Sequence, residues 1–242
     1  MKILKVVDGE YPWDVRVEKV CSALTERGHD VHMAARNRDG RVLEERLDEA
    51  TVHRLKPWPW LGSGVDAAFQ FPAFFNPRWY RLIRRTAAEI DASAIIVRDI
   101  PLGPTAIKAG QSLGMPVVLD MAENYPAMIR DLWTTRATKF GDALVRNPRA
   151  VEAVERWVLE RIDHTIVVVE ESRDRLEAEL GVPSDKITVV SNTPSLSRLE
   201  TFASIGDENR GEREGQAFTI GYLGVMETAR GVGLVIDAIA DA

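Results

Sequence analysis

Residues 94–101 read AIIVRDIP, a short apolar run that ends in a charged pair and a proline. Similar apolar runs, bounded by turn-forming residues, recur along the chain at 3–7, 31–35, 117–120, 165–169 and 187–190. Their hydrophobicity is continuous rather than alternating, which is typical of strands that are covered on both faces. These runs therefore predict a parallel β-sheet.

Segments with apolar residues at helical spacing separate the runs, at 15–27, 78–90, 105–113, 150–161 and 172–180. Three of them are followed by Gly28, Gly114 and Gly181, at the position where a left-handed helix end favours glycine. This alternation of strands and helices predicts an α/β fold with a doubly wound parallel sheet.

The stretch 204–216 breaks the pattern, because it is polar, charged and rich in glycine, with almost nothing to bury. Such a composition indicates an exposed linker or loop. A short β-rich run, a glycine turn and an amphipathic helix pattern follow it. We therefore expect one domain over 1–200, a linker over 201–216 and the first βα element of a second domain over 217–242.

The composition excludes several classes of protein. The chain has 242 residues, of which 45% are hydrophobic and 28% charged, so extensive disorder is not expected. Its net charge of -6 argues against a general nucleic-acid binder, which needs surplus Lys and Arg. The single Cys21 excludes an intramolecular disulfide and a multi-cysteine zinc site, and it favours a cytoplasmic setting.

Carboxylates gather directly after the predicted strands, where ligands bind in a doubly wound sheet. Four of five such segments contain Asp or Glu, the five being 8–16, 98–101, 120–126, 170–172 and 191–194. Carboxylates suit sugar hydroxyls or a reacting centre. The alternative is that these residues cap the following helices and that the prolines set the turns.

Several catalytic signatures are missing from the sequence. The first post-strand loop contains only Gly9, so the three-glycine dinucleotide fingerprint is absent and a nicotinamide enzyme is not expected. A phosphate-binding GxxxxGK[ST] loop, an HExxH metal site and a GxSxG elbow are also absent. The four histidines lack ligand spacing, so we expect them to be structural and predict no metal site and no cofactor.

The region 58–85 is unusual because it is rich in aromatic residues up to Tyr80 and carries Arg78, Arg81, Arg84 and Arg85 within or just beyond that aromatic run. One interpretation is a peripheral membrane surface at the inner face of the cell membrane, where rings enter the headgroup zone and guanidinium groups meet lipid phosphates. The other is a loop that buries its rings in a small satellite core while the arginines stay solvated.

Taken in order, the post-strand motifs resemble the N-terminal half of glycosyltransferases of the GT-B fold, family 4 type. The resemblance rests on the segments 11–16 (Tyr-Pro-x-Asp-x-Arg), 98–102 (Arg-Asp-Ile-Pro-Leu), 120–126 (Asp-Met-Ala-Glu-Asn-Tyr-Pro), 167–170 and 186–192. It implies a Rossmann-like acceptor-side domain, followed by the start of a Rossmann-like donor-binding domain that reads Ile-Gly-Tyr-Leu-Gly at 220–224. We expect a fragment of the second domain only, as in a truncated chain.

The resemblance further implies retaining, metal-independent transfer of a sugar from a nucleotide-diphosphate donor to a glycan or lipid-linked acceptor. It assigns Glu123 and Asp99 as catalytic candidates that orient the acceptor. It assigns the substrate-binding candidates Gly9, Arg16, Arg98, Asn124, Tyr125, Gly224 and Arg230. The two arginines near the strand ends would hold an anionic group or, alternatively, neutralise the neighbouring carboxylates Asp14 and Asp99.

Two departures from the family pattern are visible. Ala122 precedes Glu123 where many members have histidine, and Val225 stands where many have arginine. The resemblance implies that the chain is inactive alone. A different class of function is a non-catalytic module that binds a glycan or lipid, or that pairs with a separate donor-binding chain.

Overall fold

The computed structural model describes residues 1–12, 14–58, 60–72, 74–135, 147–193, 220–224 and 231–240. The chain divides into two compact units, Met1–Thr193 and Pro194–Ala242. In the second unit, residues 220–224 form no strand, whereas the helix α10 spans Val232–Ala240. The predicted linker at 201–216 lies outside the described residues.

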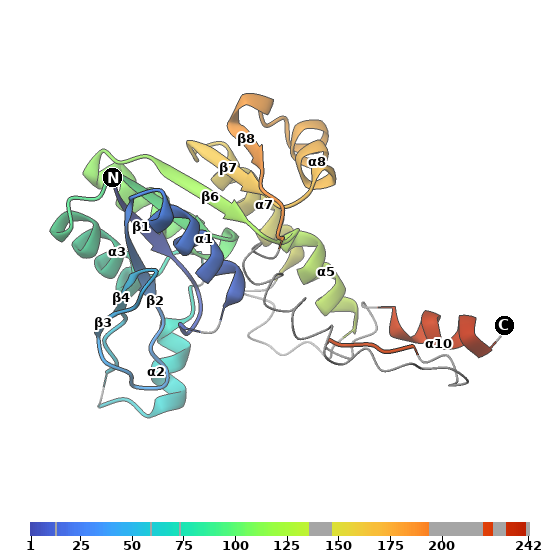
Figure 1. Cartoon of the computed structure of the whole chain (residues 1–242), viewed down its shortest axis with the longest axis horizontal. Helices are drawn as coiled ribbons and strands as arrows, with labels where there is room; N and C mark the ends of the chain where they lie inside the picture. The colour runs from blue at the N-terminus through green and yellow to red at the C-terminus, as the bar shows by residue number, and fades with distance from the viewer. Residues whose placement is uncertain are drawn as a thin grey trace, which may run out of the picture. The chain divides into compact units, whose positions relative to one another are not determined.

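Eight strands in the described part of the chain form one sheet in the order β3-β4-β2-β1-β5-β6-β7-β8 (Figure 1). All neighbouring pairs are parallel except β3 with β4, which is antiparallel. The strands are β1 (Lys2–Val6), β2 (Asp30–Ala35), β3 (Glu44–Arg46), β4 (Thr51–Arg54), β5 (Ala94–Arg98), β6 (Val117–Met121), β7 (His164–Val167) and β8 (Ile187–Val189).

Helices connect the strands, and their ends follow local chemistry. Asp14, Asn76 and Asn147 cap α1, α3 and α7 by accepting from backbone N–H groups of the first turn. Gly114 and Gly181 end α4 and α8 at φ 66° and 65°, which glycine adopts without strain. The helices of this unit are α1 (Val15–Glu26), α2 (Ser63–Gln70), α3 (Pro77–Glu89), α4 (Gly103–Leu113), α5 (Tyr125–Thr135), α7 (Pro148–Leu159) and α8 (Glu170–Leu180), with short 3-10 turns at Ile100–Leu102 and Ser184–Lys186.

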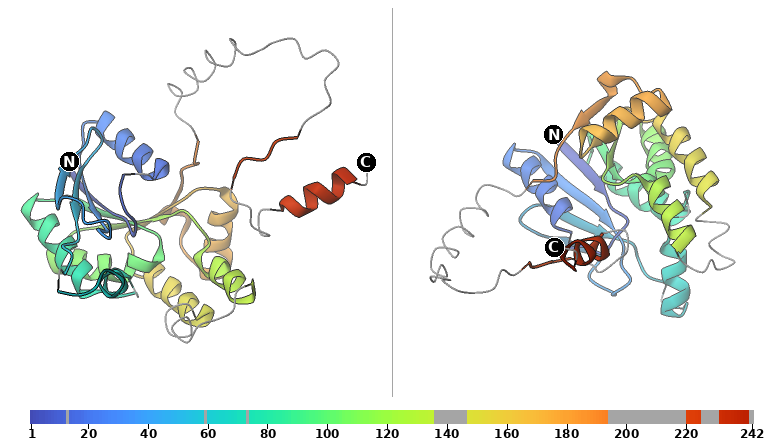
Figure 2. Two further views of the ribbon diagram at one scale, coloured as in Figure 1. Left: turned by 90° about the horizontal axis from the view of Figure 1, so that it is seen from below. Right: turned by 90° about the vertical axis from the view of Figure 1, so that its right-hand side faces the viewer.

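Each face of the sheet has its own core. On one face, Leu4 and Val6 of β1 pack with Trp79 of α3, Ile107 of α4 and other buried side chains. On the opposite face, Val31, Met33 and Ala35 of β2 pack with Val17 and Cys21 of α1. Figure 2 shows α1 on one side of the sheet and α3, α4, α5 and α7 on the other. The sheet is therefore covered from both sides, as the continuous apolar runs predict.

The region 58–85 is partly a buried network. Trp79 is completely buried, and its indole N–H donates to the Gln70 carbonyl at 2.8 Å. Arg78 and Asp66 form an ion pair at 2.8 Å, and both side chains are 8% exposed. The guanidinium of Arg78 also lies 4.0 Å from the ring centroid of Trp58. Neither interpretation describes these residues, because Trp79 packs in the main core and Arg78 is buried rather than solvated, while other rings and arginines of the region remain exposed.

None of the helices in the described segments combines the length and the apolar character that crossing a bilayer requires.

Candidate functional site

The carboxyl ends of β1, β5 and β6 are adjacent in the sheet, so the loops that follow them lie together. In the register of β5 and β6, Arg98 lies opposite Asp120. The loop after β6 begins with Ala122 and Glu123 and leads into α5. Charged side chains from three separate parts of the sequence therefore meet at this edge.

The base of the site is a buried ion pair between Lys5 and Asp120. Nζ of Lys5 donates to Oδ2 of Asp120, and the side chains are 0% and 11% exposed. Lys5 is fully buried and Asp120 is nearly so, and each charge depends on the other because an unpaired buried charge is strongly destabilising. This pair joins β1 to β6 across β5.

Arg98 lies between two carboxylates. Its guanidinium is 3.6 Å from Oδ2 of Asp14 and 3.6 Å from Oδ2 of Asp99. Asp99 has φ 57°, and its Oδ1 accepts from the backbone N–H of Ala122 at 2.9 Å. Burial raises the pKa of Asp99 to about 6, although Arg98 and this hydrogen bond act in the opposite direction. The side chain of Asp99 is thus fixed on both oxygens.

Glu123 lies at the rim of the site and is more accessible. Its Oε1 is 3.4 Å from a guanidinium nitrogen of Arg16, and the two side chains are 51% and 47% exposed. A pair this exposed contributes little to stability. Both groups are consequently available to a ligand without a large desolvation penalty.

A cavity of about 390 Å³ adjoins this cluster. Its apolar wall comes from α1 and from the ends of β7 and β8, through Val20, Leu24, Ile166, Val168 and Val190. Its polar wall includes Arg16, Arg98 and Asp120 together with residues 191–193. An apolar cavity with a few convergent polar groups is the usual form of a small-molecule site.

The chain that leaves β8 is tied to α1 beside this cavity. Nζ of Lys19 donates to Oδ1 of Asn192 at 2.7 Å and to the carbonyl of Thr193 at 2.6 Å. These contacts hold the segment that follows β8 against the helix that follows β1.

The family described as glycosyl transferase 4-like domain matches residues 14–193 of this chain. The match covers most of the sequence and nearly all of the first compact unit. The chain belongs to this family. Among curated protein sequences, none matches it.

Solved structures similar to this glycosyl transferase 4-like chain confirm the fold. Sucrose-phosphate synthase from Thermosynechococcus elongatus matches with 14% identity and a TM-score of 0.59, over 85% of this chain and 52% of the other. UGT2 of Phytolacca americana, complexed with UDP-2fluoro-glucose and pterostilbene, matches with 12% identity and a TM-score of 0.53, over 84% and 56%. This chain therefore spans about half the length of these structures. The predicted Rossmann-like GT-B fold is confirmed.

The structure brings four of the predicted site residues of the glycosyl transferase 4-like domain together. Arg16, Arg98, Asp99 and Glu123 form the cluster described above. Arg98 lies 3.6 Å from the carboxylates of Asp14 and Asp99, which are the two neighbours named in the alternative for the arginines. Arg16 has the carboxylate of Glu123 as its neighbour.

The other predicted residues are placed differently. Oδ1 of Asn124 accepts from the N–H of Ala127 at 3.1 Å, as a cap of α5, and the half-buried Tyr125 begins that helix. The carbonyl of Gly9 accepts from the N–H of Arg36 at 2.9 Å, beyond the end of β2. Gly224 belongs to the second unit, and Arg230 lies outside the described residues.

Sequence reasoning missed Lys5 and Lys19 as members of the site. Lys5 carried a signal, because a lysine within an apolar strand implies a buried anionic partner. Lys19 carried none, since its contacts are with residues more than 170 positions away. In the part of the chain that the structure describes, no cluster of His, Cys, Asp and Glu has the arrangement of a metal site.

Proposed function

We propose that this chain supplies the acceptor side of a glycosyltransferase that transfers a sugar from a nucleotide-diphosphate donor to a glycan or lipid-linked acceptor. Membership of the glycosyl transferase 4-like family supports the reaction class. The observation that carries the acceptor role is Glu123, an exposed carboxylate that pairs with Arg16 and directly follows Ala122, both of which line the cavity. A carboxylate in this position accepts hydrogen bonds from sugar hydroxyls.

The charge balance of the edge favours an acceptor over a diphosphate. Three cations, Lys5, Arg16 and Arg98, each have a carboxylate partner within 3.6 Å. A diphosphate would have to compete with these carboxylates for the cations. A neutral acceptor with hydroxyl groups could instead donate hydrogen bonds to the carboxylates and accept them from the cations. Glu123 would orient the acceptor, and Asp99 would position the loop through its bond to Ala122.

The donor would be a nucleotide sugar bound mainly through the second unit. Structural neighbours are described in complex with UDP and with UDP-2fluoro-glucose, which supports this class of donor. Gly224 and Arg230 are the proposed diphosphate contacts. Retention of the anomeric configuration follows from the resemblance to family 4, and the transfer would need no cofactor besides the nucleotide sugar, which is a substrate.

A glycan array that includes lipid-linked oligosaccharides tests the acceptor role on the 242-residue chain. We expect saturable binding to at least one acceptor, and about a tenfold weaker Kd in Glu123→Gln, since one charge-assisted hydrogen bond is lost. The matched control is Glu179→Gln, because Glu179 is an exposed glutamate on α8. Equal losses in both variants would contradict the proposed site.

A second measurement separates catalysis from binding. Because the cations of the carboxyl edge are already paired, we expect the chain alone to release no product from UDP-, GDP- or ADP-sugars in the presence of the bound acceptor. Unaided turnover would contradict the proposal that this chain supplies the acceptor side and needs a further donor-binding chain. Binding that never leads to transfer when a donor-binding chain is added would instead favour the non-catalytic module.

A further inference from the structure

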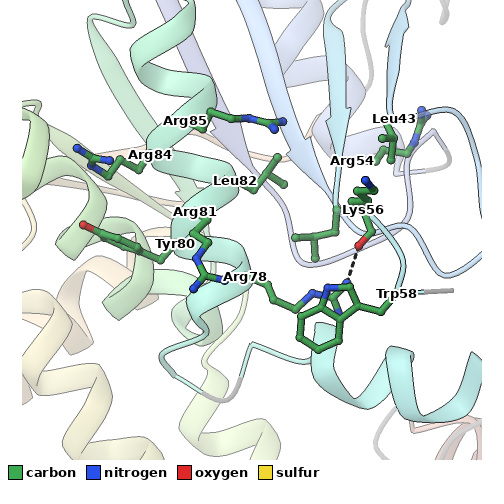
Figure 3. Close-up of a pocket in the computed structure, with 11 residues that line it drawn as sticks. Leu43, Arg54, Lys56, Trp58, Arg78, Tyr80, Arg81, Leu82, Arg84 and Arg85 are labelled. Carbon is green, nitrogen blue, oxygen red and sulfur yellow. Dashed lines mark hydrogen bonds between the residues drawn. The ribbon is translucent and has the colours of Figure 1, made fainter. Parts of the chain in front are cut away.

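A second cavity, of about 500 Å³, lies between α3 and the chain that follows β4. We call it the arginine groove, and its basic lining consists of Arg54, Lys56, Arg78, Arg81, Arg84 and Arg85. Trp58 and Tyr80 also line it, together with three leucines. Figure 3 shows Arg78, Arg81 and Arg85 succeeding one another along α3, with Trp58 beside Arg78.

The cations at the base of the groove are already bound within the protein. Arg54 is completely buried and pairs with Glu45 at 2.5 Å. Arg78 pairs with Asp66 and donates to the carbonyl of Lys56 at 2.6 Å. These two arginines stabilise the fold and are not available to an external anion.

The cations at the rim differ from those at the base. Lys56, Arg81 and Arg84 are exposed, and no ion pair or side-chain hydrogen bond joins them to the described residues. Arg85 has only a loose contact of 3.6 Å with Glu89, in which both side chains are more than 60% exposed. This local surplus of positive charge stands out because the whole chain carries a net charge of -6.

Exposed aromatic rings extend the groove. Trp60, Phe69 and Phe75 are 74%, 53% and 41% exposed. Trp60 and Phe69 each lie 5.6 Å from Trp58, between ring centroids, and Phe75 lies 6.1 Å from Tyr80. Each exposed ring is thus in contact with a ring that lines the groove, so the apolar and basic surfaces are continuous.

We propose that the arginine groove and these three rings form a docking surface for a bilayer that contains anionic phospholipid. Unpaired Lys and Arg side chains attract an anionic leaflet by about 1 kcal/mol each, and aromatic rings favour the interfacial zone. A small phosphate compound would account for the cations but not for the exposed rings. The docking does not depend on sugar transfer, so it can fail or succeed independently of the proposed function.

Vesicle co-sedimentation of the full chain tests this surface. We compare phosphatidylcholine vesicles with vesicles that also contain phosphatidylglycerol, and expect tighter binding to the second kind, by a margin that shrinks as the salt concentration rises. Arg81→Gln/Arg84→Gln removes two unpaired charges and should weaken the partition coefficient by about 10- to 30-fold. Trp60→Ser/Phe69→Ser should also weaken it, and this loss should persist at high salt.

The matched control is Arg149→Gln/Lys186→Gln, which removes the same charge from exposed positions outside the groove. It should bind the anionic vesicles within about twofold of the parent chain. An equal loss in the control, or equal binding to both kinds of vesicle, would overturn the proposal.

A titration with a soluble phosphate compound distinguishes binding of lipid phosphates from binding of a free phosphate ligand. Glycerol phosphate is titrated into the chain in a thermal-shift experiment without vesicles. Stabilisation that disappears in Arg81→Gln/Arg84→Gln, together with absent vesicle binding, would assign the groove to a small phosphate ligand and overturn the membrane proposal. Vesicle binding that glycerol phosphate displaces only weakly would support it.

Discussion

The carboxyl edge of the sheet and the arginine groove both concentrate charge, but their cations differ in how they are neutralised. At the edge, Lys5, Arg16 and Arg98 each face a carboxylate within 3.6 Å. Along the rim of the groove, Arg81 and Arg84 have no such partner among the described residues. A buried, paired cation such as Lys5 holds the protein together, whereas an unpaired cation, or an exposed one such as Arg16, is available to a ligand.

The two regions are recognisable as functional sites by different features. The edge is recognisable as a site because side chains from distant parts of the sequence converge on one cavity. The groove is recognisable because cationic side chains without an ion-pair partner lie next to exposed aromatic rings. The first arrangement should respond to mutation through stability as well as binding, and the second through binding alone.

The largest expected effect is the loss of the buried pair at the edge. Lys5→Met leaves Asp120 buried without a partner, so we expect the free energy of unfolding to fall by about 3–5 kcal/mol. Urea denaturation followed by circular dichroism measures the change. The double variant Lys5→Met/Asp120→Leu should recover most of the loss, because no charge then remains buried. A Lys5→Met variant as stable as the parent would mean that the ion pair does not contribute to the free energy of unfolding.

Asp99→Asn gives a smaller effect of the opposite sign. Burial raises the pKa of Asp99 to about 6, so the folded state prefers the protonated form. Its stabilising contribution is complete below the unfolded pKa of 3.8 and is lost as the pH rises through about 6. A neutral Asn keeps the acceptor for the Ala122 N–H and tolerates φ 57°.

At pH 7 we therefore expect Asp99→Asn to be more stable than the parent chain by about 1–3 kcal/mol, because the raised pKa of Asp99 already includes its attraction to Arg98. The difference should shrink toward zero near pH 4. Urea denaturation of both proteins at the two pH values measures it, and a variant that is less stable at pH 7 would contradict the assigned cause of the pKa shift.

The sequence predicted most of the fold of the first unit, because its central strands are continuous apolar runs. All six predicted strands and all five predicted helices are present within a few residues of their expected bounds. The missed strands are at the edge of the sheet, where β3 reads Glu-Glu-Arg and β4 contains only one aliphatic residue. The missed α2 is short and lacks a side-chain cap, whereas the amphipathic α5 could have been predicted.

The sequence predicted which residues belong to the edge cluster better than it predicted which of them pair with one another. Motif order selected Arg16, Arg98, Asp99 and Glu123, but pairing between positions up to 115 apart, as in Lys5 with Asp120, depends on strand order. The region 58–85 could not be divided in advance for the same reason. Arg78 is buried and pairs with Asp66, which is twelve residues earlier in the sequence. Arg81 lies about one turn further along the helix and is exposed.

The smallest expected effect is the change in stability on neutralising the rim of the groove. Arg81→Gln/Arg84→Gln removes charges that have no partner in the described structure, so the free energy of unfolding should stay within about 0.5 kcal/mol of the parent value. Urea denaturation of the same protein batch used with vesicles measures it. A stable variant that loses vesicle binding would assign these arginines to an external anion, because nothing inside the protein would then depend on their charge. A loss of more than about 1 kcal/mol would instead place them with the paired cations of the edge.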